Sequence, residues 1–227
     1  MKKLTFYTEL SYLLGLIIIA FSAALAVKAD FGVSMVIAPA YILHLKVSEY
    51  LPWFTFGVAE YLFQGFLVIV TTLIMRRFRL SYLFSFVTAV LYGTLVDAAS
   101  LLLAGLPTDT IAVRLVWYVA GIVLCSFAVS LFFHTYISPE AYELIVKELA
   151  AKTRIDISKV KTAYDLISAA LGIVLSFSFF GFGVFEGVKW GTIVCAFING
   201  WLIGRFSKLL ERFFVFKNKF PLEKYFI

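Results

Sequence analysis

Charged residues are scarce in this chain. Only 15% of its 227 residues are Asp, Glu, Lys or Arg, whereas 62% are hydrophobic. Soluble domains carry about a quarter charged residues, so the composition excludes a water-soluble globular protein. Cysteine and histidine are rarer still, with two residues each. A metal site built from these ligands is not expected, and Cys125 and Cys195 both fall in apolar stretches without a redox spacing.

Catalytic motifs are absent as well. The sequence contains no Gly-x-Ser-x-Gly, no His-Glu-x-x-His and no phosphate-binding loop. We therefore expect neither an enzyme nor a bound cofactor, and any transport would be passive, ion-coupled or driven by another subunit. The net charge of +6 does not indicate a nucleic-acid partner, because the basic residues are distributed over loops and chain ends instead of forming one patch.

Hydrophobic runs make up most of the chain. Crossing a bilayer core of about 30 Å takes about 20 helical residues. Runs of this order occur at 9–27, 52–75, 80–104, 111–133, 162–182 and 188–208. The predicted fold class is an all-α polytopic membrane protein with six transmembrane helices, whose first partner is the lipid bilayer. An even number of spans places both termini on the same side.

The basic residues indicate which side that is. Of the 20 Lys and Arg residues, only Lys28, Lys46, Arg114 and Lys189 fall on the side opposite the termini. Loops rich in Lys and Arg stay in the cytoplasm. We therefore expect a multi-pass protein of the inner (cytoplasmic) membrane with both termini in the cytoplasm. A seventh span through 33–45 would destroy this distribution.

Two segments between the spans are too short to cross the bilayer. Segment 33–45 is apolar, contains Pro39, and follows the first span on the outer side. Segment 138–152 follows the fourth span on the cytoplasmic side. Short hydrophobic segments in corresponding positions of two halves are typical of substrate sites in carriers built from repeats. Interfacial helices without a role in transport remain the alternative for both segments.

The second short segment carries signals of an amphipathic helix. Ser138 is predicted as its N-cap and Pro139 as its first helical residue. The pairs Glu143–Lys147 and Glu148–Lys152 have the i,i+4 spacing of an exposed helix face. The distal part of this helix is therefore expected on the membrane surface, and only its beginning to line a cavity.

The two halves of the chain have the same plan. Each contains a span, a short segment and two further spans, so that 1–108 and 109–210 are predicted as repeats and 211–227 as a basic aromatic tail. Glu60 and Asp165 occupy corresponding positions. Three spans per half is an odd number, which requires the second half to be inverted relative to the first.

Polar side chains inside apolar spans are costly and are usually functional. The candidate substrate- or ion-binding residues are Glu60, Gln64, Asp97, Asp165, Ser34, Glu140 and Asn199. Other roles remain open for some of them. Asp165 also fits a structural ion pair with Lys161, Asp97 is close enough to the surface to be hydrated, and Asn199 also fits a bridge between helices.

Several of these stretches resemble a known family. Ser138–Glu140, Lys159–Lys161 with Asp165, Gly187–Ile193 and Gly200 are similar to the second half of the YczE/YyaS/YitT-type bacterial membrane proteins, and Ala29–Ser34 and Tyr92–Asp97 to their first half. The resemblance covers about 10–206 and implies the same fold. Members of this uncharacterised family are generally described as candidate transporters. After Ser34 the family usually has a Pro-Trp-Asp-like triplet, whereas this chain has Met35, Val36 and Ile37, so a strictly symmetric site is not expected.

These observations lead to a hypothesis of a secondary transporter for a small solute. The excess of acids among the candidates favours a cationic or zwitterionic substrate, or proton coupling through Glu60 or Asp165. The alternatives are a non-transporting membrane helper or regulator, which would dock through segment 138–152 and the tail, and a substrate-binding subunit of a larger importer. The sequence leaves a homo-oligomer open.

Overall fold

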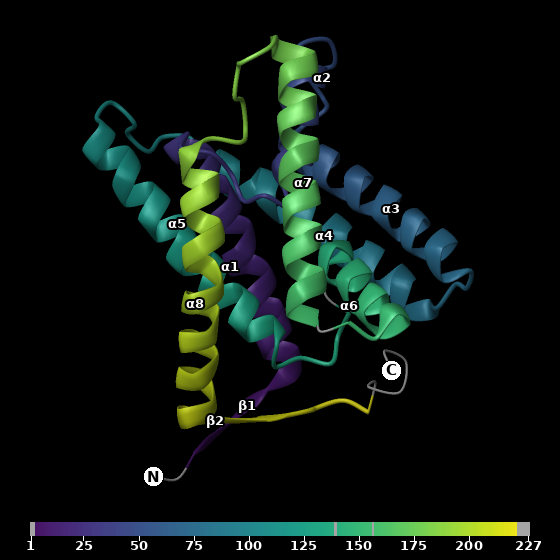
Figure 1. Cartoon of the computed structure of the whole chain (residues 1–227). Helices are drawn as coiled ribbons and strands as arrows, with labels where there is room; N and C mark the ends of the chain where they lie inside the picture. The colour runs from purple at the N-terminus through teal and green to yellow at the C-terminus, as the bar shows by residue number, and fades with distance from the viewer. Residues whose placement is uncertain (1–2, 139, 156, 222–227) are drawn as a thin grey trace.

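Eight helices and one pair of short strands make up the part of the chain that the structure describes. The computed structural model describes residues 3–138, 140–155 and 157–221. Figure 1 shows the elements in chain order. Their bounds are β1 (Leu4–Tyr7), α1 (Thr8–Ala29), α2 (Ala38–Val47), α3 (Phe56–Met75), α4 (Leu80–Leu102), α5 (Ile111–Phe132), α6 (Ala141–Thr153), α7 (Ile157–Phe180), α8 (Trp190–Phe213) and β2 (Phe214–Lys217).

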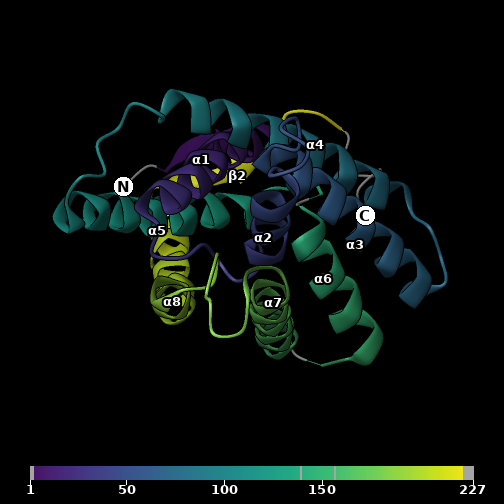
Figure 2. The same ribbon diagram turned by 90° about the horizontal axis from the view of Figure 1, so that it is seen from above.

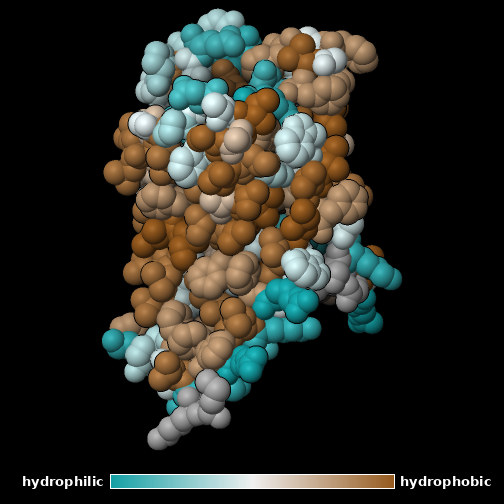
Figure 3. All heavy atoms as spheres, turned by 90° about the vertical axis from the view of Figure 1, so that its left-hand side faces the viewer, coloured by the Kyte–Doolittle hydropathy of each residue, from teal (hydrophilic) through white to brown (hydrophobic). Residues whose placement is uncertain are grey.

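Six of the helices, α1, α3, α4, α5, α7 and α8, are long and apolar enough to cross a membrane. Hydrophobic side chains form a broad band around the middle of the face shown in Figure 3, and hydrophilic side chains gather toward both ends. This distribution is what a bilayer selects, because apolar surface faces the lipid tails and charged groups reach the interfaces. The protein is a multi-pass membrane protein, and the predicted fold class is confirmed.

The predicted order of long and short helices is confirmed, but some bounds differ. The helix α3 begins at Phe56 instead of near 52, because the Thr55 side chain accepts a hydrogen bond from the Val58 N–H and caps the helix there. The helix α7 begins at Ile157 and not at 162, and α8 continues to Phe213 instead of ending at 208. Polar residues at helix ends extend both helices beyond their hydrophobic runs.

The second short helix differs more from its prediction. Its N-cap is Glu140, not Ser138, and Pro139 lies outside the described residues. The helix α6 packs against α3, α4 and α7, and its last residues, 151–153, are exposed. Glu148 is buried and pairs with Arg77 at 3.1 Å and with Arg79 at 3.4 Å. The predicted pair with Lys152 is wrong, because the turn between α3 and α4 offers two guanidinium groups to the same carboxylate.

The packing of the helices repeats between the two halves. The first helices of the halves, α1 and α5, pack against each other in the centre. Around them, α1 contacts α4 as α5 contacts α8, and α2 contacts α7 as α6 contacts α3. Figure 2 shows α6 beside α3 and α2 beside α7. Each short helix therefore packs against a long helix of the other half, as expected for inverted repeats that interlock.

One pair of helices breaks this symmetry. The helices α3 and α4 cross closely at Gly57 and Gly93, where a Cβ on Gly57 would lie 2.0 Å from the Gly93 carbonyl oxygen. Their counterparts α7 and α8 form no comparable contact within the described residues. Figure 2 shows them standing apart, with α8 beside α5 and α7 beside α2. A Cβ on Gly204 of α8 would meet nothing within 4 Å.

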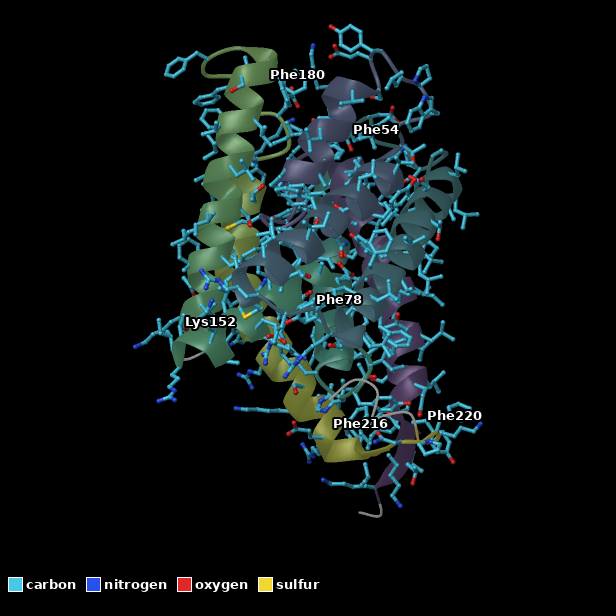
Figure 4. The ribbon with its side chains drawn as sticks, turned by 90° about the vertical axis from the view of Figure 1, so that its right-hand side faces the viewer. Phe54, Phe78, Lys152, Phe180, Phe216 and Phe220 are labelled. Atoms are coloured by element: carbon cyan, nitrogen blue, oxygen red, sulfur yellow. The ribbon has the colours of Figure 1, made fainter. Side chains whose placement is uncertain are left out.

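The two strands join the ends of the chain. β1 and β2 pair in parallel, with Leu4 opposite Phe214, at the lower end of the molecule in Figure 1. We call this the strand end and the opposite end the far end. In Figure 4, Phe216 and Phe220 lie toward the strand end, and Phe54 and Phe180 toward the far end. The Glu9 carboxylate strengthens the junction by accepting hydrogen bonds from the Lys219 and Phe220 N–H groups.

Candidate functional site

A cavity of about 690 Å³ lies between the two halves. Its wall includes residues of α1, α5, α6, α7 and α8, Tyr92 of α4, and the segment 34–37 that precedes α2. We call it the central cavity. It occupies the position where α7 and α8 stand apart, so the asymmetry between the halves creates the space. Its volume falls in the range of about 300–1,000 Å³ that small-molecule sites usually have.

One side of the central cavity is charged. Glu140 and Glu143 reach it from the beginning of α6, and Lys161 and Asp165 from the beginning of α7. Lys161 and Asp165 form an ion pair at 2.9 Å, as their i,i+4 spacing predicts. Lys147 also lines the cavity. Three carboxyl groups therefore face two ammonium groups on this side of the cavity.

The opposite side of the cavity is mainly apolar. It is formed by small and aliphatic side chains such as Ile19 and Ala23 of α1, Ile122 of α5 and Ala196 of α8. The polar residues there include Ser22 of α1 and Asn199 of α8, whose side-chain oxygen accepts a hydrogen bond of 2.6 Å from the Ser126 hydroxyl. A solute bound in the cavity would meet charge on one side and hydrocarbon on the other.

The cavity is closed at the far end by the turn after α1. Gly32 adopts φ = 101°, and a Cβ there would lie 2.4 Å from the Thr192 hydroxyl oxygen. Only glycine fits this backbone and this contact. The Thr192 hydroxyl donates to the Val33 carbonyl at 2.7 Å. This hydrogen bond holds the beginning of α8 against the turn after α1. Asp30 adds ion pairs with Arg114 at 2.9 Å and Lys189 at 2.6 Å.

A second group of polar residues lies behind the charged side of the cavity. The amide nitrogen of Gln64 donates to Glu60 Oε2 and to Glu140 Oε2, each at 3.3 Å. The Ala141 N–H donates to Gln64 Oε1 at 3.1 Å, which fixes the amide orientation. The Tyr142 hydroxyl donates to Glu60 Oε2 at 2.9 Å. We call Glu60, Gln64 and Glu140 the acid–amide cluster.

The acid–amide cluster is almost inaccessible to solvent. Glu60 and Gln64 are 0% exposed and Glu140 is 4% exposed. Burial raises the pKa of Glu140 well above its usual range, and the nearby Glu143 and Glu60 carboxylates raise it further. Of the three residues, Glu140 alone lines the central cavity. Glu140 is therefore the member of the acid–amide cluster that contacts the cavity.

The candidate residues from the sequence occupy three different places. Ser34, Glu140, Asp165 and Asn199 line the central cavity. Glu60 and Gln64 lie behind it in the acid–amide cluster.

Asp97 is separate from both of these places, because its carboxylate accepts hydrogen bonds from the Thr55 hydroxyl and the Gly57 N–H at the beginning of α3. These contacts give Asp97 a role in joining α4 to α3.

Sequence reasoning missed several residues of the site. The spacing of Glu143 and Lys147 predicts an exposed helix face, yet Glu143 lines the cavity, because α6 packs against α3, α4 and α7. Cys125 and Cys195 fall in apolar runs that give no sign of a site, and both line the cavity. Lys161 has a usable signal and its pair with Asp165 is anticipated, since a lysine four residues before an intramembrane acid is well placed to pair with it.

Within the described residues, no three His, Cys, Asp or Glu side chains are grouped so that they could hold a metal ion.

Comparisons with known proteins identify the family of the chain and nothing more. No curated protein and no solved structure matches the chain. Residues 6–208 match the model of a family of unknown function, DUF6198, and this match covers most of the chain, which therefore belongs to DUF6198.

Proposed function

We propose that this protein is a secondary transporter for a small cationic or zwitterionic solute, which binds in the central cavity. The observation that carries the proposal is the cavity of about 690 Å³ between two inverted halves. Carriers with inverted repeats commonly place the substrate at the repeat interface, beside broken or short helices. Here Ser34 and Glu140, which precede the two short helices, both line the cavity.

The character of the cavity favours the class of solute. Glu140, Glu143 and Asp165 provide carboxylates, while Lys147 and Lys161 provide ammonium groups. Since Lys161 is already paired with Asp165, the groups left to attract a solute are the Glu140 and Glu143 carboxyl groups and one ammonium group, that of Lys147. A protonated amine would bind at the charged side, and a carboxylate on the same solute would bind near the lysines. The apolar side would contact the hydrocarbon part of the solute.

The competing proposal of a helper or regulator depends on free docking surfaces. Segment 138–152 and the tail would be these surfaces. In the fold, α6 packs against α3, α4 and α7, and the beginning of the tail pairs with β1. Both segments are engaged within the chain, which supports the carrier over the helper.

We further propose that the strand end faces the cytoplasm. The basic loops and the tail gather at this end, whereas Lys28, Lys46, Arg114 and Lys189 belong to the far end. By the positive-inside rule this orientation places both termini in the cytoplasmic compartment of a cytoplasmic membrane. The resemblance to the YczE/YyaS/YitT-type proteins supports the same membrane and the same class of function.

Binding and flux can be tested with defined probes. We expect members of a panel of primary amines, quaternary ammonium ions and zwitterionic amino acids to raise the unfolding temperature of the detergent-purified protein, because ligand binding stabilises the folded state. Probes that do so should enter or leave proteoliposomes containing the protein.

The Asp165→Asn variant should lose at least about tenfold of this flux, which corresponds to about 1.4 kcal/mol of binding or transition-state free energy. Asp109→Asn is the control, since Asp109 is an exposed loop carboxylate outside the cavity. Unchanged flux in Asp165→Asn, or no stabilising probe of any charge type, would reject the proposal.

A further inference from the structure

The acid–amide cluster holds two carboxyl groups in a buried place with few donors. The amide hydrogens of Gln64 are divided between Glu60 and Glu140, and the Tyr142 hydroxyl adds one donor to Glu60. All three bonds go to the Oε2 atoms. Oε1 of Glu60 and Oε1 of Glu140 are buried and have no hydrogen-bond partner among the residues that the structure describes. An ionised carboxylate with one oxygen left unpaired in such a place is unfavourable.

The surroundings provide little positive charge. The titratable side chains within electrostatic reach of Glu60 or Glu140 come from α1, α4, α5, α6 and α7, and they are Tyr12, Tyr92, Cys125, Tyr142, Glu143, Lys161 and Tyr164. Lys161 is the only base in this set, and its ammonium group is already paired with Asp165 at 2.9 Å. Two ionised carboxylates bridged by one amide would repel each other without compensation.

We propose that the acid–amide cluster is a binding site for one proton, shared between Glu60 and Glu140 and exchanged with the central cavity through Glu140. Binding breaks one O–H bond of a hydronium ion in the cavity, forms one O–H bond on a carboxylate and leaves a water molecule, so that one of the two negative charges is removed. Release breaks the carboxyl O–H bond and returns the proton to water as hydronium. Glu140 is the exchanging group because its own side chain lines the cavity, whereas Glu60 does not line it and lies behind Gln64 and the Tyr142 hydroxyl.

The position of the site connects proton binding to the arrangement of the halves. Glu60 and Gln64 belong to α3 in the first half, and Glu140 immediately precedes α6 in the second. Protonation removes the repulsion across this contact and stabilises the packing of α6 against α3. Loss of the proton weakens the contact. The consequence for transport, a proton that couples to solute movement, rests on the carrier function proposed above.

The repeat explains why a proton site and a solute site occur together. Glu60 and Asp165 are corresponding residues of the two halves. Glu60 is enclosed with a second acid, whereas Asp165 is paired with Lys161 at the edge of the cavity. The first half lacks an acid at the position that corresponds to Glu140, where it has Met35 and Val36. Only one of the two related positions can therefore hold a pair of acids.

Infrared spectroscopy of the purified protein tests the site without any solute. Protonated carboxyl groups absorb separately from carboxylates, and exposed Asp and Glu are ionised near pH 7. We expect the wild-type protein to retain a protonated carboxyl band at neutral pH that disappears as the pH rises. The band should disappear at lower pH in Glu60→Gln and in Glu140→Gln, and should be absent from the double variant.

Two further variants keep the test valid if the double variant does not fold. Tyr142→Phe removes a donor that favours ionised Glu60, so its band should persist to higher pH than that of the wild type. Glu49→Gln is the control, because Glu49 is exposed and paired with Lys46 on the surface, and its band should equal that of the wild type. A missing wild-type band, or a band unchanged in all cluster variants, would overturn the proposal.

A metal cation is the other occupant that two carboxylates could hold. If Na⁺ or K⁺ raised the unfolding temperature at constant pH in the wild type but not in Glu140→Gln, the site would bind that cation and the assignment to a proton would be wrong. The proposal of a proton site and the proposal of a carrier can be rejected independently of each other. Absence of solute flux with an intact band would reject the carrier alone, and flux with no band would reject the proton site alone.

Discussion

At the scale of single residues, the sharpest prediction concerns Gly32 in the turn after α1. Gly32→Ala should lower the free energy of unfolding by more than about 1 kcal/mol, because its φ of 101° is unfavourable for alanine and the new Cβ would collide with the Thr192 hydroxyl. The loss should appear as a lower midpoint of thermal unfolding in detergent. Gly105→Ala, where a Cβ meets nothing within 4 Å, should leave the midpoint unchanged. Equal midpoints for both variants would contradict the proposed contact between the turn and α8.

The same scale shows what the sequence can predict about the site. The pair Lys161–Asp165 follows from spacing along one helix, and the sequence predicts it correctly. The contact between Glu60 and Glu140 through Gln64 joins residues distant in sequence, and no local rule gives it. Asp97 is an acid inside an apolar span, as a site residue would be, yet its carboxylate joins α4 to α3. A buried acid is easy to find in a sequence, but its partner depends on how the halves pack.

At the scale of elements, the close crossing of α3 and α4 distinguishes the two halves. Gly57→Ala should destabilise the protein by about 1–3 kcal/mol, since the added methyl group would overlap the Gly93 carbonyl and force the helices apart. The variant should also elute earlier or aggregate in size-exclusion chromatography. Gly204→Ala is the matched control, because Gly204 lies in a long helix but a Cβ there meets nothing within 4 Å. If Gly204→Ala lost more stability than Gly57→Ala, the asymmetry between the halves would be refuted.

The elements also show where hydrophobic patterns are sufficient. The order of six long and two short helices could be predicted because bilayer thickness sets the length of a span. The placement of α6 could not. Its charged residues fit an exposed face with i,i+4 pairs, but Glu148 pairs with Arg77 and Arg79 from another part of the chain. An amphipathic pattern indicates that one face is polar and does not say whether the polar partner is water or protein.

At the scale of the whole molecule, the two halves share one fold but differ in one contact. The first half has α3 packed on α4, and the second half has α7 apart from α8 with the central cavity between them. If the halves are inverted repeats, the second half can adopt the packing that the first half already has. The cavity is closed at the far end by the contact of α8 with the turn after α1. The complementary state would close α8 on α7 at the strand end and would open the far end.

This second state can be trapped by cross-linking. Residues of the second half that correspond to Gly57 and Gly93 are Thr162 and Gly204, which belong to the halves of α7 and α8 nearest the strand end. In a background without Cys125 and Cys195, the double variant Thr162→Cys/Gly204→Cys should form a disulfide in proteoliposomes under mild oxidation. The cross-link should stop solute flux, and a reductant should restore it. A pair placed at the far end, Gly172→Cys/Trp190→Cys, should not form a disulfide in the same state. If the first pair never forms a disulfide while flux continues, the two halves do not exchange conformations and the solute moves by another route.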